Sequence, residues 1–313
     1  MQRNKLSYLL ITLKGIAMGA ADVIPGVSGG TIAFITGIYE ELLSSIKNFP
    51  TAIPILFSKE GGINKFWKTA NMNFLIALGL GIGISFLSLA QLMTFLLEKH
   101  PIVTWSFFFG LILSSVWYVM RELNEIDFKV IISFIFGAVL AWWITTVSPT
   151  ETTNAYWFIF LSGSIAICAM ILPGISGSFI LLLLGKYIFM MNAIKEMKIS
   201  IILVFMAGAG TGILLFSHIL TWLLKHYHAA TVAVLGGFMV GSLNKVWPWK
   251  EVTSTFTNSH GEITPLTESN ILPTSYEAIT HHQALLIPAI ISAIVGVSIV
   301  FGLEYIANRL KKD

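Results

Sequence analysis

The sequence predicts an all-α polytopic membrane protein made of two inverted-topology repeats, each a re-entrant helical hairpin followed by three transmembrane helices. Three observations support this fold class. Hydrophobic residues make up 55% of the 313 residues, charged residues only 11%, and the mean hydropathy is +0.80. Apolar runs of roughly 17 to 25 residues, the length that crosses a bilayer, recur along the chain. One long motif also occurs twice. This composition is typical of membrane proteins and excludes an ordinary soluble domain.

Ten apolar segments follow one another along the chain. The first half contains Leu6 to Ile24, Val27 to Ile46, Phe74 to Leu97, Ile102 to Met120 and Val130 to Val147. The second half contains Trp157 to Leu172, Ile175 to Ile194, Ile199 to Leu224, Thr231 to Val246 and Ala284 to Ile306. Polar sequence is limited to an amphipathic stretch around Phe49 to Lys68 and one polar loop, 247–282.

Basic residues near the segment ends predict the orientation, because Lys and Arg are retained on the cytoplasmic side. With both termini inside, one side collects Arg3, Lys5, Lys47, Lys59, Lys65, Lys68, Arg309, Lys311 and Lys312. Lys195 and Lys198 oppose this assignment. We therefore predict a multi-pass protein of the inner (cytoplasmic) membrane, with cytoplasmic termini and the 247–282 loop outside.

A gapless internal match divides the chain into repeats at 1–150 and 151–313. Gly15 to Ile46, with the core IPGVSGGTIAFITGIY, aligns with Gly163 to Ile194, with the core LPGISGSFILLLLGKY. Downstream, Gly79, Gly81 and Gly83 resemble Gly208, Gly210 and Gly212, in a spacing that lets helices approach closely. Each unit has an odd number of segments, so the second unit is expected to be inverted relative to the first.

Each copy of the motif contains a helix break. Pro25 and Gly26 in the first copy, and Pro173 and Gly174 in the second, cannot continue a helix cleanly. Exposed to hydrocarbon, such a break would leave backbone amides unsatisfied, so it is tolerated only inside protein or beside a wet cavity. We therefore expect both breaks to face one shared interior.

Small and hydroxylated residues follow each break, where a new helix is expected to begin. The candidate substrate-binding residues are Ser28, Gly29, Gly30 and Thr31 in the first copy, and Ser176, Gly177 and Ser178 in the second. A helix start offers free N–H groups and partial positive charge, which suits a phosphate or carboxylate. Two such starts from opposite faces predict a midplane anion site.

Ionisable residues inside apolar segments are candidates for function. Asp22 lies three residues before Pro25, and its counterpart in the second copy is Met170. Asp22 suits a proton or sodium site, or a pairing with Lys14 or Lys186. Glu41 is a second candidate for coupling to H⁺ or Na⁺, and Lys186 offers a cation to a phosphate.

The residues leave two other readings open. One is an ion-coupled carrier of a small anion. The other is an intramembrane serine protease, since residues 26–30 fit G-x-S-x-G with Ser28 as nucleophile and His218 as base. Recurrence of the pattern at Ser176 argues against a single nucleophile, so we predict a transporter and not an enzyme.

Other classes of ligand are not expected. A single cysteine, Cys168, supplies no thiolate metal cluster, so we predict no metal and no cofactor. A formal charge of +3 does not indicate nucleic-acid binding. Membrane lipids are expected partners, and a homo-oligomer stays open.

The motifs MGAADVIPGVSGGTIAFITGIYEELL, Met18 to Leu43, and ILPGISGSFILLLLGKY, Ile171 to Tyr187, resemble a known family. It is the family of bacterial and archaeal membrane proteins catalogued as domain of unknown function 368, linked to polyprenyl-phosphate transport. The resemblance covers nearly the whole chain. It implies a polyprenyl-phosphate lipid as partner and recycling of undecaprenyl phosphate from the outer to the inner leaflet. Residues matching the family's motifs are Asp22, Pro25, Gly26, Ser28, Gly29, Gly30, Thr31 and Tyr39, then Pro173, Gly174, Ser176, Gly177 and Ser178.

Overall fold

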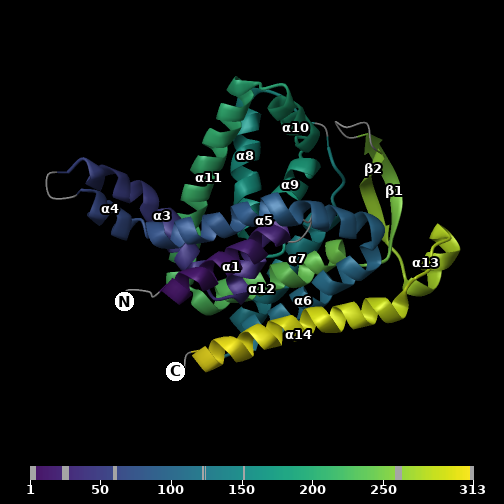
Figure 1. Ribbon diagram of the computed structural model, residues 1–313. Helices are drawn as coiled ribbons and strands as arrows, with labels where there is room; N and C mark the ends of the chain where they lie inside the picture. Colours follow the sequence, from purple (N-terminus) through teal and green to yellow (C-terminus); the bar gives the residue numbers. More distant parts are fainter. Residues whose placement is uncertain are drawn as a thin grey trace.

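The computed structural model describes residues 5–22, 28–58, 62–121, 123, 125–150, 152–257 and 263–310, and most of them are helical (Figure 1). The helices of the first half are α1 (Lys5–Asp22), α2 (Gly29–Ile35), α3 (Tyr39–Leu56), α4 (Ile63–Thr69), α5 (Met72–Lys99), α6 (Pro101–Arg121) and α7 (Phe128–Thr146). Those of the second half are α8 (Tyr156–Ile171), α9 (Gly177–Leu183), α10 (Tyr187–Lys195), α11 (Ile199–His226), α12 (His228–Val246), α13 (Pro273–Thr280) and α14 (Leu286–Leu310).

The described residues contain five helices long and apolar enough to cross a membrane, or six if the bent pair α9 and α10 counts as one span. The five spans lie in α5, α6, α7, α11 and α12. In α14, Leu286–Gly302 is a shorter apolar helix. These helices coincide with the six predicted transmembrane segments, and their bounds differ from the predictions by a few residues. The chain is therefore a multi-pass membrane protein.

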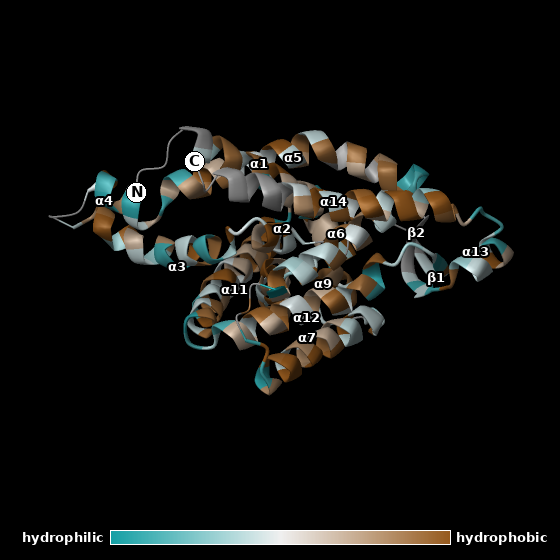
Figure 2. Cartoon of the chain, turned by 90° about the horizontal axis from the view of Figure 1, so that it is seen from below, coloured by the Kyte–Doolittle hydropathy of each residue, from teal (hydrophilic) through white to brown (hydrophobic). Residues whose placement is uncertain are grey.

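Apolar side chains cover the outside of the molecule, as expected for a surface that contacts lipid. Brown, apolar residues colour much of α5, α7 and α14 in Figure 2. Phe136 and Val139 of α7 are more than half exposed, and Ile290 of α14 is half exposed. The interior holds a separate buried cluster that includes Tyr39 and Met239, one from each half of the chain.

Two predicted segments are each divided into two helices by a glycine turn. Segment 27–46 contains α2 and the first part of α3, separated at Gly37 with φ +70°, and α3 continues to Leu56, beyond the predicted end at Ile46. Segment 175–194 contains α9 and α10, which meet at 106° near Gly185 with φ +64°. Positive φ is strained for residues with a Cβ, so glycine lets the chain turn here. The two turns occupy matching positions in the internal alignment.

Helix α1 packs against α5, and α8 packs against α11 in the same way. A Cβ on Gly15 would collide with the carbonyl of Leu78, and one on Gly163 would collide with that of Phe205. The partner helices also contribute a glycine each. Gly81 of α5 lies against the Thr12 carbonyl of α1, and Gly208 of α11 lies against the Phe160 carbonyl of α8. In Figure 1 the α8 and α11 pair runs across the direction of α5.

This packing corrects the predicted alignment of the downstream glycines. Gly81 is the structural counterpart of Gly208. A Cβ on Gly79 or Gly83 would meet no atom of another described helix within 4 Å. Gly212 does lie against Ser164 of α8, as its spacing predicted. Three glycines spaced by two residues can be aligned in more than one register, and only the contact with the partner helix distinguishes the registers.

The long helices at the end of each half pack on the other half. Helix α14 packs on α6, and α7 packs on α12, while α6 and α12 contact each other. A Cβ on Gly110 of α6 would collide with the carbonyl of Ala293, and one on Gly237 of α12 would collide with that of Phe134. The two halves are therefore intertwined through α7 and α14.

The polar segment is folded, so the prediction of a loop over 247–282 is wrong. Strands β1 (Lys250–Thr257) and β2 (Ile263–Asn270) form an antiparallel pair in which Lys250 lies opposite Asn270, and α13 follows. A small apolar cluster that includes Trp249 holds the segment on the helices, and the Trp249 indole donates to the carbonyl of Ala284. Figures 1 and 2 both place this hairpin opposite the end where α1 begins and α14 ends.

Candidate functional site

The two copies of the motif contact each other in the interior. The Gly174 amide donates to the Thr31 hydroxyl at 2.9 Å, and the Ser28 hydroxyl donates to the carbonyl of Met170 at 2.9 Å. The Tyr39 hydroxyl donates to the carbonyl of Ile171 at 3.2 Å. Ser28 and Thr31 are fully buried. The first helix start therefore lies against the break that follows α8.

Glycine allows this close approach. A Cβ on Gly30 would collide with the carbonyl oxygen of Ile171, and a Cβ on Gly177 would lie 2.7 Å from the carbonyl oxygen of Ala166. Both clashes are with backbone atoms, which cannot rotate away as a side chain can. Side chains at Gly30 and Gly177 would separate the α2 and α9 starts from α8.

The start of α2 is filled by oxygen atoms of the protein itself. Ser28 is the N-cap, and its Oγ accepts a hydrogen bond from the Gly30 amide at 3.0 Å. The Asp22 carboxylate accepts from the Gly29 amide at 2.7 Å. Carboxylates are stabilised at helix starts for the same reason that phosphates bind there. The position that an anion would take next to Gly29 is thus held by Asp22.

The start of α9 is different. Ser176 is its N-cap but makes no side-chain capping bond among the described residues, and its hydroxyl instead lies 2.7 Å from that of Ser178. The counterpart of Asp22 here is Met170, which carries no carboxylate. The two helix starts are therefore alike in sequence but unlike in capping.

Of the two predicted helix breaks, the structure describes the second, at Pro173 and Gly174. Gly174 has φ +88°, and a Cβ there would lie 2.7 Å from the Ser242 hydroxyl, so only glycine fits. Pro173 precedes it after α8 ends at Ile171. Pro25 and Gly26 lie outside the described residues.

Lys186 lies at the far end of α9 from Ser176. Its buried ammonium donates to the Thr152 carbonyl at 2.8 Å and to Asn154 Oδ1 at 2.7 Å. The rings of Phe158 and Phe189 also flank the ammonium. Lys186 thus ties the glycine turn to the segment before α8.

Glu41 belongs to a separate region at the start of α3. It accepts from the Asn71 side chain at 2.9 Å, and its neighbour Glu40 lies 3.3 Å from His228 Nε2. A cavity of about 460 Å³ opens between α3 and α11 here, and its lining includes Glu40, Glu41 and Lys225. Asp22 does not line this cavity.

His218 is not positioned as a base for Ser28 by any contact among the described residues. Its Nδ1 lies 2.8 Å from the carbonyl of Leu214 in its own helix, and its side chain is exposed on α11. The buried Ser28 hydroxyl directs its proton to the Met170 carbonyl. A serine protease needs a base within reach of the nucleophile.

Sequence reasoning missed two features. The carbonyls of Met170 and Ile171 receive the hydrogen bonds of the first motif, and backbone acceptors leave no residue signature. Lys245 and Lys250 also converge on Glu268 at the polar hairpin. Their signal in the sequence is a pair of lysines flanking Trp247-Pro248-Trp249 at the end of an apolar segment.

Comparison with known proteins gives a consistent set of matches. The family model described as VCA0040-like, undecaprenyl phosphate translocase-like, matches residues 18–264. The polyprenyl-phosphate transporter of Vibrio cholerae serotype O1 is 46% identical over 309 residues, covering 99% of this chain and 100% of the relative. The polyprenyl-phosphate transporter of Staphylococcus aureus is 36% identical over 254 residues, covering 75% of this chain and 85% of the relative. No solved structure matches the chain significantly.

Proposed function

This chain belongs to the undecaprenyl phosphate translocase-like family, and from that premise we propose that it carries a polyprenyl phosphate across the cytoplasmic membrane. The substrate is undecaprenyl phosphate, moved from the outer to the inner leaflet for reuse as a lipid carrier in cell-wall synthesis. Two relatives named polyprenyl-phosphate transporter support this substrate class. The activity is transport and not catalysis.

The contact between the second helix break and the start of α2 carries the proposal. The hydrogen bond from the Gly174 amide to the Thr31 hydroxyl joins irregular backbone of the second motif to the first turn of α2 in the interior. Irregular backbone is tolerated at membrane depth only where it is buried or lines a cavity. A phosphate needs such polar groups because a bare ion in hydrocarbon is prohibitively costly, while its prenyl tail remains in lipid.

We further propose that the halves are inverted repeats with re-entrant hairpins. The matching contacts of α1 with α5 and α8 with α11, and of α6 with α14 and α12 with α7, support a pseudo-two-fold relation. Such a relation lets a site at the repeat interface open to each leaflet in turn. The termini would lie in the cytoplasm, with the hairpin of β1 and β2 outside.

Asp22 gives the cycle a coupling step. In the present arrangement its carboxylate accepts from the Gly29 amide, so an incoming phosphate must displace it. Protonation or sodium binding would neutralise Asp22 and weaken its hold on the helix start, because a neutral acid is a poorer acceptor than a carboxylate. We propose that H⁺ or Na⁺ binding at Asp22 thereby promotes phosphate binding by Ser28, Gly29 and the α9 start.

A small-anion carrier remains the second candidate, because the same polar groups would suit a free anion. A vesicle assay separates the two. Vesicles containing the purified protein are loaded with fluorescent polyprenyl phosphate, and a membrane-impermeant quencher reports the outer leaflet. A parallel sample measures uptake of radioactive inorganic phosphate. We expect lipid reorientation without phosphate uptake. Phosphate uptake with lipid rates equal to those of protein-free vesicles would instead establish the small-anion carrier.

A further inference from the structure

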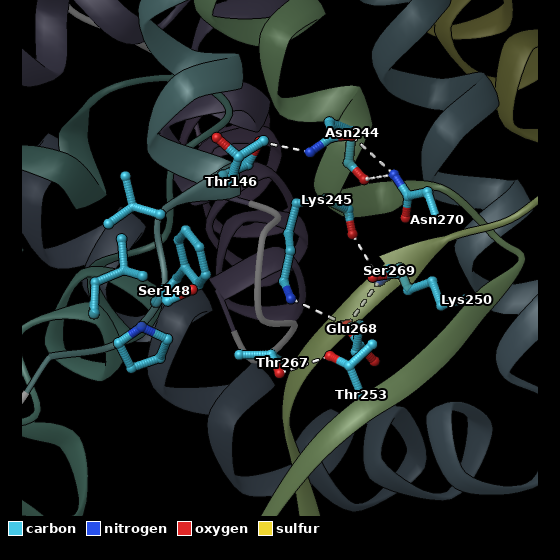
Figure 3. Close-up of a pocket in the computed structure, with 15 residues that line it drawn as sticks. Thr146, Ser148, Asn244, Lys245, Lys250, Thr253, Thr267, Glu268, Ser269 and Asn270 are labelled. Carbon is cyan, nitrogen blue, oxygen red and sulfur yellow. Dashed lines mark hydrogen bonds and ion pairs between the residues drawn. The ribbon is translucent and has the colours of Figure 1, made fainter.

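A second polar cavity lies at the edge of the membrane helices, where α7 and α12 end beside the hairpin of β1 and β2 (Figure 3). Its volume is about 460 Å³, which is within the range of small-ligand pockets. The motif residues Ser28 to Thr31 do not line it. It is therefore distinct from the contact between Gly174 and Thr31.

Two lysines and one glutamate dominate its charge. Lys245 Nζ and Lys250 Nζ both contact Oε2 of Glu268, at 3.1 and 3.3 Å, and their side chains are 20% and 7% exposed. Two ammonium groups thus share one carboxylate oxygen, which leaves a net positive charge in a largely desolvated place. A purely structural ion pair would need only one lysine. Charge neutrality would be restored by an anion.

The position of Lys250 is fixed by its surroundings. Its ammonium also donates to the Lys245 carbonyl at 2.8 Å and lies 4.2 Å from the centre of the Trp105 ring. Lys245 in turn lies 5.3 Å from the ring of Phe179. Both cations are therefore held in place rather than extended into solvent. A preorganised pair loses little side-chain entropy when it binds a ligand.

Hydroxyl and amide groups complete the lining. The polar uncharged residues of the cavity are Thr145, Thr146, Ser148, Asn244, Thr253, Thr267, Ser269 and Asn270. Several already hydrogen-bond one another, including Asn244 to Thr145 and Thr253 with Thr267. In Figure 3, Asn270 is directed toward Asn244 and Thr253 toward Thr267, in the neighbourhood of the lysines. Hydroxyls and amides can donate to the several oxygen atoms of a phosphate.

The cavity also touches the second re-entrant hairpin. Phe179 and Leu183 of α9 line it, and α9 begins at the Ser176 and Ser178 pair. An anion in the cavity would thus contact α9, a helix of only seven residues. The cavity therefore lies beside the helix that begins at the second copy of the motif.

We propose that this cavity binds a phosphate monoester through Lys245 and Lys250, and that it receives the substrate headgroup before the headgroup reaches the helix breaks. The inference deepens the proposed function and rests on it for the identity of the lipid. Phosphate oxygens replace Glu268 as the partner of the two ammonium groups, and Glu268 holds the empty site together between turnovers. Lysine suits this role as a compact charge that binds phosphate without a fixed fork geometry.

Calorimetric titration of the purified full chain in detergent with farnesyl phosphate tests the site. Lys245→Gln and Lys250→Gln should each weaken binding by about tenfold or more, since a charge-assisted hydrogen bond is lost. Glu268→Gln should strengthen binding several-fold, because it removes the competing carboxylate. This opposite sign is not expected if the three residues only stabilise the fold. Lys198→Gln, which removes an exposed lysine also paired with a glutamate, should bind as wild type does.

Identical affinities of both lysine variants and the wild type would overturn the proposal. Lys245 is the more exposed lysine, so Lys245→Gln supplies the answer even where Lys250→Gln does not fold. Farnesol that binds as tightly as farnesyl phosphate would also contradict it. Inorganic phosphate is the third ligand. If it binds as tightly as farnesyl phosphate, the site takes free phosphate, whereas much tighter farnesyl phosphate identifies the lipid.

The vesicle assay separates this inference from the proposed function. Suppose that the wild type reorients polyprenyl phosphate and that the lysine variants reach half their maximal rate at the same lipid concentration as the wild type. The cavity assignment then fails and the function stands. If the wild type does not reorient the lipid yet binds farnesyl phosphate through the lysines, the function fails and the binding site stands.

Discussion

The backbone amide of Gly174 donates a hydrogen bond to the hydroxyl of Thr31, 143 positions earlier in the chain, at 2.9 Å. Both groups are buried, and each belongs to one copy of the duplicated motif. This bond joins the break after α8 to the start of α2. The two copies therefore form one polar junction rather than two separate kinks.

Replacing Thr31 with Val should weaken this junction. Valine has nearly the same shape but offers no acceptor, so the buried Gly174 amide would lose its partner at a cost of about 1–3 kcal/mol. We expect a lower melting temperature and slower lipid reorientation. Thr31→Ser retains the acceptor and is the control. Equal melting temperatures for the Val and Ser variants would show that the bond contributes nothing to stability.

Replacing Gly30 with Ala should force the two copies apart. The new methyl group would collide with the Ile171 carbonyl, and overpacking of this kind costs about 1–3 kcal/mol. Gly83→Ala in α5 is the matched control, because a Cβ there would meet no atom of another helix within 4 Å among the described residues. Melting temperature and reorientation rate should both fall for Gly30→Ala only. A Gly30→Ala protein that matches the control in both measurements would contradict the described contact.

Asp22→Asn should separate coupling from folding. Asparagine keeps an oxygen acceptor for the Gly29 amide, so the melting temperature should change little. The side chain can no longer bind a proton or attract Na⁺, so reorientation should lose its dependence on an imposed proton or sodium gradient. Glu40→Gln, at an exposed carboxylate, is the control. Unchanged gradient dependence in Asp22→Asn would remove Asp22 from the coupling step.

Binding at the Lys245 and Lys250 cavity should depend on pH. Burial lowers the pKa of Lys250 to about 8, the Lys245 charge adds to this effect, and Glu268 opposes it. Burial alone would raise the pKa of Glu268, but the two lysines hold it below its usual value, so Glu268 stays ionised. A lowered lysine pKa means that the positive charge is lost as pH rises through about 8.

Farnesyl phosphate should therefore bind more weakly above about pH 8. Its own second ionisation, near pH 6, is complete there, so the charge of the ligand does not change over this range. Calorimetry across this range measures the effect. Lys250→Gln should remove the step near pH 8. A step of the same size in that variant would assign the titration to another group.

The membrane helices and the break at Pro173 and Gly174 could be predicted because their causes are local. A continuous apolar run predicted 74–97, and the helix α5 extends only two residues further at each end, Met72–Lys99. Gly174 has the positive φ expected of the second break, and Pro25 and Gly26 of the first lie outside the described residues. The turns at Gly37 and Gly185 were not predicted. Duplication placed the two copies in a shared interior, and the bond between Thr31 and Gly174 confirms their contact.

Features that depend on distant contacts could not be predicted. The sequence match pairs the halves, but it does not reveal that α7 packs on α12 and α14 on α6. Likewise, Glu268 meets Lys245 and Lys250 only because the polar segment folds as a hairpin, whose strands were not recognised among mixed polar residues. The hydrogen bond from the Gly29 amide to the Asp22 carboxylate, seven positions earlier in the chain, is likewise a contact that local patterns do not specify.

The rate at which labelled polyprenyl phosphate changes leaflets in reconstituted vesicles tests the central claim most directly. Wild-type protein should raise this rate well above that of protein-free vesicles. The double variant Ser28→Ala with Ser176→Ala, which removes one hydroxyl from each copy of the motif, should be at least about tenfold slower, equivalent to about 1.4 kcal/mol in the barrier. Wild-type vesicles that reorient the lipid no faster than empty ones would contradict the account.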